Sequence, residues 1–349
     1  MSRFIPSFTA LAATMLVPLA VGCSDRERAT PSASASTPAA GTTSTVSTGA
    51  VAPSTSPSAT MPGRDSGASV AGTVTPSYAD AERAFHRGRY EEAASMFDAF
   101  SASEPDNAWG HYMLGLSSWK IGDHDRALEA FDAALRLEPS HRKSLLNSAR
   151  VLLETSRPDD ALERVERALA IEPMSSDGLR LKGRAHHELG EITEAIDAYE
   201  RALALDDRDV WAMNNLGYLY IQQGRSDAAL RPLARAVEIR GNVPVFQNNF
   251  GTALERSGHF AAASEAYLAA LRADSTYGKA AVGLARAKAH EVGSDSTSVD
   301  VAALSREFQA EVEQWRTRSV TADSAKVTDS VKAVDSVESG QMIKDSASQ

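Results

Sequence analysis

The sequence predicts an all-α fold, a solenoid of stacked helical hairpins between Val74 and Tyr277. A 34-residue pattern repeats six times in this range without an insertion, and a fixed period of this length indicates stacked helical hairpins. A small residue, which suits a left-handed turn between two helices, stands at the middle of every copy. These residues are Gly88, Gly122, Ser156, Gly190, Gly224 and Gly258.

The N-terminal segment, residues 1–22, indicates a secretory signal peptide. It has a short basic start, a mostly apolar stretch over residues 4–19 and the small residues Ala20, Val21 and Gly22. The apolar stretch is too short for a stable membrane span. The chain's one cysteine, Cys23, follows directly, so no disulfide within the chain is expected.

Residues 20–23 resemble a bacterial lipobox, which implies that Cys23 carries lipid in an exported protein. We therefore expect a lipid-anchored protein of the cell envelope, on the periplasmic side of a membrane, and Ser24 is compatible with the outer membrane. The alternative is an ordinary secretory signal that is cut after Gly22 and leaves a free thiol.

A Ser, Thr, Ala and Pro-rich segment, residues 23–73, follows the signal. It has almost no large apolar side chains, so it cannot bury enough surface to offset the entropy of ordering. We expect a disordered tether with a root-mean-square reach of roughly 40 Å.

The six repeats occupy residues 74–107, 108–141, 142–175, 176–209, 210–243 and 244–277. In the second half of each copy an alanine is followed four and seven residues later by apolar side chains, which places the three on one helical stripe. The position four residues on is occupied by Phe97, Phe131, Val165, Tyr199, Leu233 and Tyr267. We expect these side chains to pack between the two helices of each hairpin.

This pattern resembles the tetratricopeptide repeat (TPR). The second copy, AWGHYMLGLSSWKIGDHDRALEAFDAALRLEPSH, carries the Leu-Gly, Gly, Ala, Phe, Ala-Leu and Pro signatures in order. The resemblance covers residues 74–277 and implies a right-handed superhelix of hairpins. It also implies a concave wall lined by the first helix of each repeat, where protein partners bind.

Three segments follow the repeats. Residues 278–291 resemble the first helix of a seventh repeat and predict a capping helix. Residues 299–317 predict an amphipathic helix, because Val301, Leu304, Phe308, Val312 and Trp315 form one continuous stripe. This helix either covers the last repeat, or is a docking helix, or folds back into the groove. Residues 318–349 predict a disordered tail.

The resemblance implies that repeat positions 2, 5, 9 and 12 face the groove. The candidate binding residues are Tyr78, Trp109, Tyr112, Trp119, Lys143, Arg150, Arg180, Arg184, His187, Trp211, Asn214, Tyr218 and Asn248, together with Phe85 and Thr252. Arg180 and Arg184 lie four residues apart on one face, so the sequence predicts that they clamp a carboxylate or phosphate. Asn147, Asn215 and Asn249 form a broken asparagine ladder, for which we favour bonds to neighbouring backbone over bonds to a partner peptide.

Charge and motifs exclude several function classes. The chain has 36 basic and 46 acidic residues and a formal net charge of −10, so it lacks the basic surface expected of a nucleic-acid binder. It has no zinc-protease, phosphate-loop or nucleophile-elbow motif. We therefore expect a protein that is not an enzyme and that has no cofactor and no metal site.

Together these features predict a lipid-anchored adaptor that grips segments of partner proteins, as in the assembly of envelope machinery. One alternative is a regulator or docking module of an envelope enzyme on another chain. A second alternative is a carbohydrate-binding lipoprotein, because Trp109, Trp119 and Trp211 could stack on sugar rings. The oligomeric state stays open.

Overall fold

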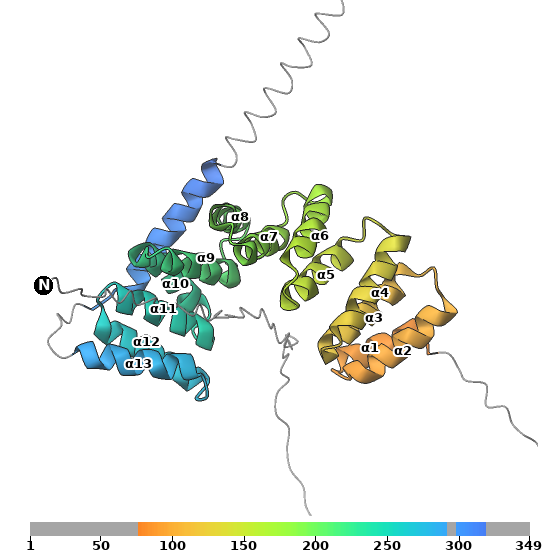
Figure 1. Ribbon diagram of the computed structural model, residues 1–349, viewed down its shortest axis with the longest axis horizontal. Coiled ribbons are helices and arrows are strands. Elements are labelled where there is room, and N and C mark those ends of the chain that lie inside the picture. Colours follow the sequence, from red (N-terminus) through yellow and green to blue (C-terminus); the bar gives the residue numbers. More distant parts are fainter. Residues whose placement is uncertain (1–75, 292–297, 319–349) are drawn as a thin grey trace, which may run out of the picture. The chain divides into compact units, whose positions relative to one another are not determined.

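The computed structural model describes residues 76–291 and 298–318. In these ranges the chain is helical and contains no strand (Figure 1), so the predicted fold class is confirmed. The predicted signal peptide, Cys23, the predicted tether and the predicted tail from residue 319 lie outside the described residues.

Six helical hairpins follow one another along the chain. The first helices are α1 (Tyr78–His86), α3 (Ala108–Ile121), α5 (Arg142–Glu154), α7 (Ser176–Leu189), α9 (Val210–Gln222) and α11 (Pro244–Arg256). The second helices are α2 (Tyr90–Ser103), α4 (His124–Leu137), α6 (Pro158–Ile171), α8 (Ile192–Leu205), α10 (Ser226–Ile239) and α12 (Phe260–Ala273). After them come α13 (Gly278–Glu291) and a C-terminal helix over residues 301–318.

The hairpins stack so that first helices contact first helices. Each of α1, α3, α5, α7, α9 and α11 contacts the next first helix along the chain, and α11 contacts α13. The backbones of second helices in neighbouring hairpins lie further apart, and these helices meet through long side chains, as in the ion pairs of Arg126 with Asp98 and of Arg164 with Asp132. We call the exposed side of the first helices the first-helix face, and the opposite side the second-helix face.

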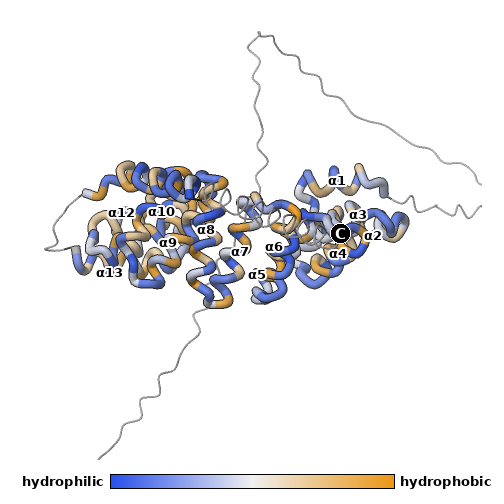
Figure 2. Tube along the Cα trace, turned by 90° about the horizontal axis from the view of Figure 1, so that it is seen from above, coloured by the Kyte–Doolittle hydropathy of each residue, from blue (hydrophilic) through white to orange (hydrophobic). Residues whose placement is uncertain are grey.

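The hairpin core matches a large residue with a small one. The side chains at the predicted packing position, from Phe97 to Tyr267, are all fully buried. Opposite Phe131 stands Gly115, where an added Cβ would lie 2.6 Å from the ring. The two helices therefore approach more closely than a larger side chain would allow. Figure 2 shows that apolar and polar residues alternate along the helices.

The small residues between the two helices of each hairpin adopt the left-handed conformation that their small size predicts. The five glycines have φ between 73° and 83°, and Ser156 has φ of 56°. Ser156 is the one residue with positive φ among the described non-glycine residues. A Cβ in this conformation is strained.

Replacing Ser156 with glycine is expected to stabilise the fold. Relief of the strain outweighs the extra freedom of glycine in the unfolded chain, so we expect a gain of about 0.5–1 kcal/mol. Urea denaturation measures this gain. The reciprocal control, Gly122→Ser, should lose a similar amount, and a loss of stability in Ser156→Gly contradicts the argument.

The C-terminal helix packs on the second-helix face of the fourth and fifth repeats. Its buried side chains Phe308, Val312 and Trp315 belong to the same apolar core as α8, α9 and α10. Arg231 of α10 lies 3.4 Å from Glu307 and 3.3 Å from Glu311. At the other end, Arg316 donates to the backbone oxygen of Ala204, at the end of α8, over 3.1 Å.

This position differs from both places that the sequence suggests for the helix. These contacts place it neither over the last repeat nor on the first-helix face. An amphipathic stripe shows that a helix must be covered, but the hydrophobic effect is not directional and does not select among similar faces. The capping position at the end of the stack is taken by α13. There Arg286 donates to both carboxylate oxygens of Glu255, over 2.8 and 3.0 Å.

Candidate partner-binding face

Three predicted aromatic residues of α3 contact α5 or its N-cap residue, and we call this line of contacts the α3–α5 seam. Trp109 packs edge-on against His141, with ring centroids 4.8 Å apart. Asn147 donates to the Tyr112 hydroxyl over 3.1 Å. The Trp119 indole N–H donates to Glu154 over 2.8 Å. The start, middle and end of α3 therefore each contact α5 through an aromatic side chain.

The three aromatic side chains differ in how much of their surface is exposed to solvent. Trp109 is 44% exposed, whereas Tyr112 is buried at 7% and Trp119 is half-buried. The Trp109 ring also packs edge-on against Tyr112, with centroids 5.5 Å apart. A large aromatic side chain is thus held in one orientation while much of its surface stays in water.

Tyr78 and Phe85, at the start of the stack, pack on their own hairpin. Tyr78 makes edge contacts with Phe97 and Phe100, with centroids 5.5 and 5.6 Å apart. Burial raises the pKa of the Tyr78 hydroxyl, and the charge of Glu82 adds to this effect. Phe85 contacts Tyr90 in the same manner, at 5.3 Å. Both residues stabilise the first hairpin through these contacts.

The predicted groove arginines, Arg150, Arg180 and Arg184, form ion pairs within the chain. Arg180 is 8% exposed and lies 2.6 Å from Asp177 and 3.0 Å from Asp209. Arg150 binds the other oxygen of Asp177. Arg184 is 5% exposed and its Nε lies 3.0 Å from Glu188.

The arginines therefore do not present the open anion clamp that their spacing predicts. Buried guanidinium groups need counter-charges, and Asp177, Asp209 and Glu188 supply them. The pattern of positions 5 and 9 shows the two arginines but not their partners, which come from other positions of the same repeat, Asp209 being its last residue.

The two aspartates respond oppositely to their surroundings. Burial acts to raise the pKa of Asp177, but the Arg150 and Arg180 guanidinium groups outweigh it and hold that pKa below its usual value. For Asp209, burial outweighs the attraction of Arg180, so its pKa is raised. Asp209 also caps α9, accepting from the backbone N–H groups of Trp211 and Ala212 over 3.0 Å each.

Predicted residues of the last three repeats also contact the neighbouring repeat. His187 bonds to Gln222 over 3.0 Å and lies edge-on to Tyr218, with centroids 5.8 Å apart. Burial lowers the pKa of His187. The half-buried Trp211 packs against Phe246, with centroids 4.9 Å apart.

The asparagines bond mostly to one another. Asn249 donates to the buried Asn214 over 2.9 Å, and Asn248 donates to Asn249 over 3.3 Å. Thr252 donates to the backbone oxygen of Asn248. These bonds link α9 to α11 through side chains, whereas the sequence favoured bonds of the ladder asparagines to neighbouring backbone.

In four of the contacts between neighbouring first helices, the two residues lie 35 positions apart in the sequence. This spacing separates Tyr112 from Asn147, Trp119 from Glu154, His187 from Gln222 and Asn214 from Asn249. A residue thus bonds to the position one beyond its equivalent in the next repeat. Sequence reasoning missed Glu154 and Gln222 because it compared equivalent positions only, and a search at 35 residues could have found them.

Buried His141 is another residue that the sequence analysis missed. Its Nδ1 accepts from the backbone N–H of Ser144 over 3.2 Å and caps α5, and its buried Nε2 has no hydrogen-bond partner among the described residues. Burial lowers the pKa of His141, and the charge of Lys143 adds to the effect. Protonation would place a proton on the atom that accepts the capping bond.

We expect the stability of the fold to fall with acidification through this site. Because the folded-state pKa of His141 is depressed, the unfolded chain takes up the proton first as the pH falls through about 6.5. The stabilisation is present above that pH and is lost below it. Urea denaturation at several values between about pH 7.5 and 5.5 should show a weaker pH dependence in His141→Asn, which keeps a capping side chain. Equal pH dependence in both proteins contradicts this assignment.

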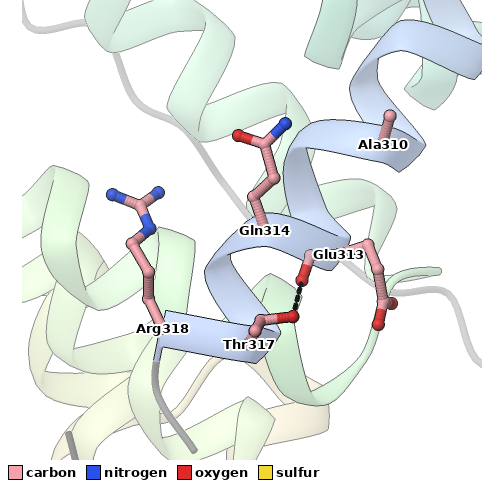
Figure 3. A pocket seen from close by; sticks show the side chains of 5 residues that line it. All are labelled: Ala310, Glu313, Gln314, Thr317 and Arg318. Atoms are coloured by element: carbon pink, nitrogen blue, oxygen red, sulfur yellow. Dashed lines mark hydrogen bonds between the residues drawn. The ribbon is translucent and has the colours of Figure 1, made fainter. Parts of the chain in front are cut away.

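Other places in the described residues offer no candidate site. A pocket beside the C-terminal helix is lined by Ala310, Glu313, Gln314, Thr317 and Arg318, all from one helix (Figure 3). In residues 76–291 and 298–318 no group of three or more His, Cys, Asp or Glu side chains could hold a metal ion. None of the helices described there is both long and apolar enough to span a bilayer.

All the family models that match the chain describe the same kind of repeat. Those described as "Tetratricopeptide repeat" match residues 78–145, 119–185 and 210–243, and one described as "TPR repeat" matches residues 183–224. The matched ranges together run without a break from residue 78 to residue 243. No curated protein sequence matches the chain at a significant level.

Similar solved structures share the helical-hairpin architecture. The APC/C hetero-tetramer Cut9-Hcn1 is 19% identical, with a TM-score of 0.54, over 59% of this chain and 41% of that chain. A tetratricopeptide repeat protein from Parabacteroides merdae is 12% identical, with a TM-score of 0.50, over 60% and 82%. MamA from Desulfovibrio magneticus RS-1 is 24% identical, with a TM-score of 0.44, over 46% and 91%. At these identities the likeness shows the fold alone.

Proposed function

This chain is a tetratricopeptide-repeat protein, and from that premise we propose that it is a non-enzymatic scaffold that holds segments of partner proteins. The fold is typical of protein–protein interaction scaffolds, and proteins built from this repeat are generally non-catalytic. We further propose that lipid on Cys23 anchors it in a bacterial cell envelope. The partner segment binds on the first-helix face.

One observation carries the proposal of a binding face: the exposure and fixed orientation of Trp109. Large aromatic side chains that stay exposed in a set orientation are typical anchors of protein interfaces. The contacts to Tyr112 and His141 limit the motion of the ring, so little side-chain entropy is lost on binding.

The same geometry gives less support to carbohydrate binding. Of the three tryptophans proposed for stacking on sugars, Trp109 is exposed, at 44%, whereas Trp119 and Trp211 are half-buried. Trp119 is bonded to Glu154 and Trp211 is packed on Phe246. A row of open aromatic platforms is therefore not present along these three residues.

Photo-crosslinking in the native host tests the scaffold function. A photoreactive amino acid replaces Trp109 in the full chain, and a control protein carries it at Leu268, which is 37% exposed on the second helix α12. We expect protein adducts from position 109 that position 268 does not give. Identical adducts, or none, from the two positions contradict a binding face at α3.

Membrane fractionation tests the anchor separately. We expect the full chain in the membrane fraction, with lipid on Cys23 by mass spectrometry, and Cys23→Ala in the soluble fraction. Cys23→Ala that stays with the membrane contradicts the lipid anchor and leaves the binding face untouched.

A further inference from the structure

Two lysines lie over two tryptophans of the α3–α5 seam. The Lys143 ammonium lies 5.0 Å from the centroid of the Trp109 ring, and the Lys120 ammonium lies 5.3 Å from that of Trp119. These are cation–π contacts. Lys143 is exposed and Lys120 is half-buried, so water and a partner can reach both pairs.

These lysines differ from the arginines of the same face in their counter-charges. Arg150 and Arg180 are bound by Asp177 and Asp209, and Arg184 is bound by Glu188. Within residues 76–291 and 298–318, neither Lys120 nor Lys143 has an ion pair with a carboxylate. The positive charge that a partner can neutralise therefore lies on the lysines.

Glu154, a carboxylate at the Trp119 end of the seam, is already engaged. Glu154 accepts the indole N–H of Trp119 over 2.8 Å and lies 3.4 Å from the His124 ring. Its side chain is 17% exposed. Glu154 thus fixes the Trp119 ring from the α5 side and leaves the lysine charge to other anions.

The spacing of the two pairs sets the length of a ligand. Trp109 and Trp119 stand ten residues apart on α3, which at 1.5 Å per residue is about 15 Å. An extended peptide rises about 3.3 Å per residue, so four to five of its residues span this distance. Tyr112 lies between the two pairs and bonds to Asn147.

We propose that the α3–α5 seam binds an extended acidic segment of a partner protein, with two carboxylates four or five residues apart. One carboxylate pairs with Lys143 and the other with Lys120, while an apolar side chain packs on Trp109. This inference rests on the proposed scaffold function and names the chemistry of its partner. The acidic chain, with a net charge of −10, repels acidic segments elsewhere, so the two lysines also fix the register.

Selection from a displayed library of random peptides of about twelve residues, about twice the predicted span, tests the proposal on the full chain. We expect enrichment of peptides with paired Asp or Glu at a separation of four or five and an apolar residue beside one of them. The variant Lys120→Met/Lys143→Met keeps the aliphatic contacts with the tryptophans and should lose this enrichment. The control Lys288→Met, on the exposed side of α13, should keep it.

A synthetic peptide from the enriched set gives the magnitude. We expect the double lysine variant to bind it about ten-fold more weakly, which is the size of two exposed charge pairs. Enrichment without paired acidic residues, no enrichment, or equal affinity of the double variant overturns the proposal. Crosslinking at position 109 together with any of these results leaves the scaffold function standing and removes only the acidic-segment inference.

Discussion

Asp209→Ala is expected to destabilise the protein by about 3 kcal/mol or more. The substitution removes the carboxylate that faces Arg180, whose side chain is 10% exposed, and it removes the cap of α9. Breaking a buried ion pair by removing one partner costs about 3–5 kcal/mol, and loss of an N-cap costs about 1 kcal/mol. The cost arises because Arg180 then keeps only one of its two carboxylates, Asp177, which it shares with Arg150.

Urea denaturation with two matched variants tests this expectation. Asp123→Ala removes the cap of α4, where Asp123 accepts from Arg126 on an exposed turn, and should lose only about 1 kcal/mol. Asp209→Asn keeps a capping oxygen without the charge and should fall between the two. If Asp209→Ala loses no more than Asp123→Ala, Arg180 does not depend on its carboxylate.

Phe308→Ala is expected to detach the C-terminal helix from the second-helix face. Phe308 is 1% exposed and lies edge-on to Trp315, with centroids 5.7 Å apart. Truncating a buried phenylalanine costs about 3–5 kcal/mol. The ion pairs of Arg231 with Glu307 and Glu311 are partly exposed and are each worth about 1 kcal/mol or less, so they cannot hold the helix alone.

Hydrogen exchange localises the expected effect. In Phe308→Ala, amides of residues 301–318 and of α8 and α10 should lose protection, while α3 to α5 should keep theirs, because stability in repeat proteins is set by neighbouring elements. The control Arg306→Ala removes a side chain that is 68% exposed on the same helix and should leave the exchange unchanged. Full protection of residues 301–318 in Phe308→Ala contradicts this account.

The proposed binding face includes contacts that repeat position does not predict. The repeat pattern places Trp109, Lys143 and Arg180 on the same side of the stack, and each of them contacts a neighbouring first helix or its N-cap residue. The pattern does not show that Asp177 and Asp209 neutralise Arg180. Those bonds depend on how far side chains reach between helices. Because the aspartates neutralise Arg180, the positive charge that we propose for partner binding is that of the lysines.

The repeat pattern is sufficient to predict the number of hairpins, the turns between their helices and the residues of the hairpin core. These properties follow from steric and apolar preferences that recur within one repeat, as at Gly122 and at Phe131 against Gly115. The pattern does not predict which charged side chains are neutralised or where the helix of residues 301–318 packs, and the folded chain shows both. Ion pairs and the docking of a distant helix depend on the three-dimensional distance between residues that no local period relates.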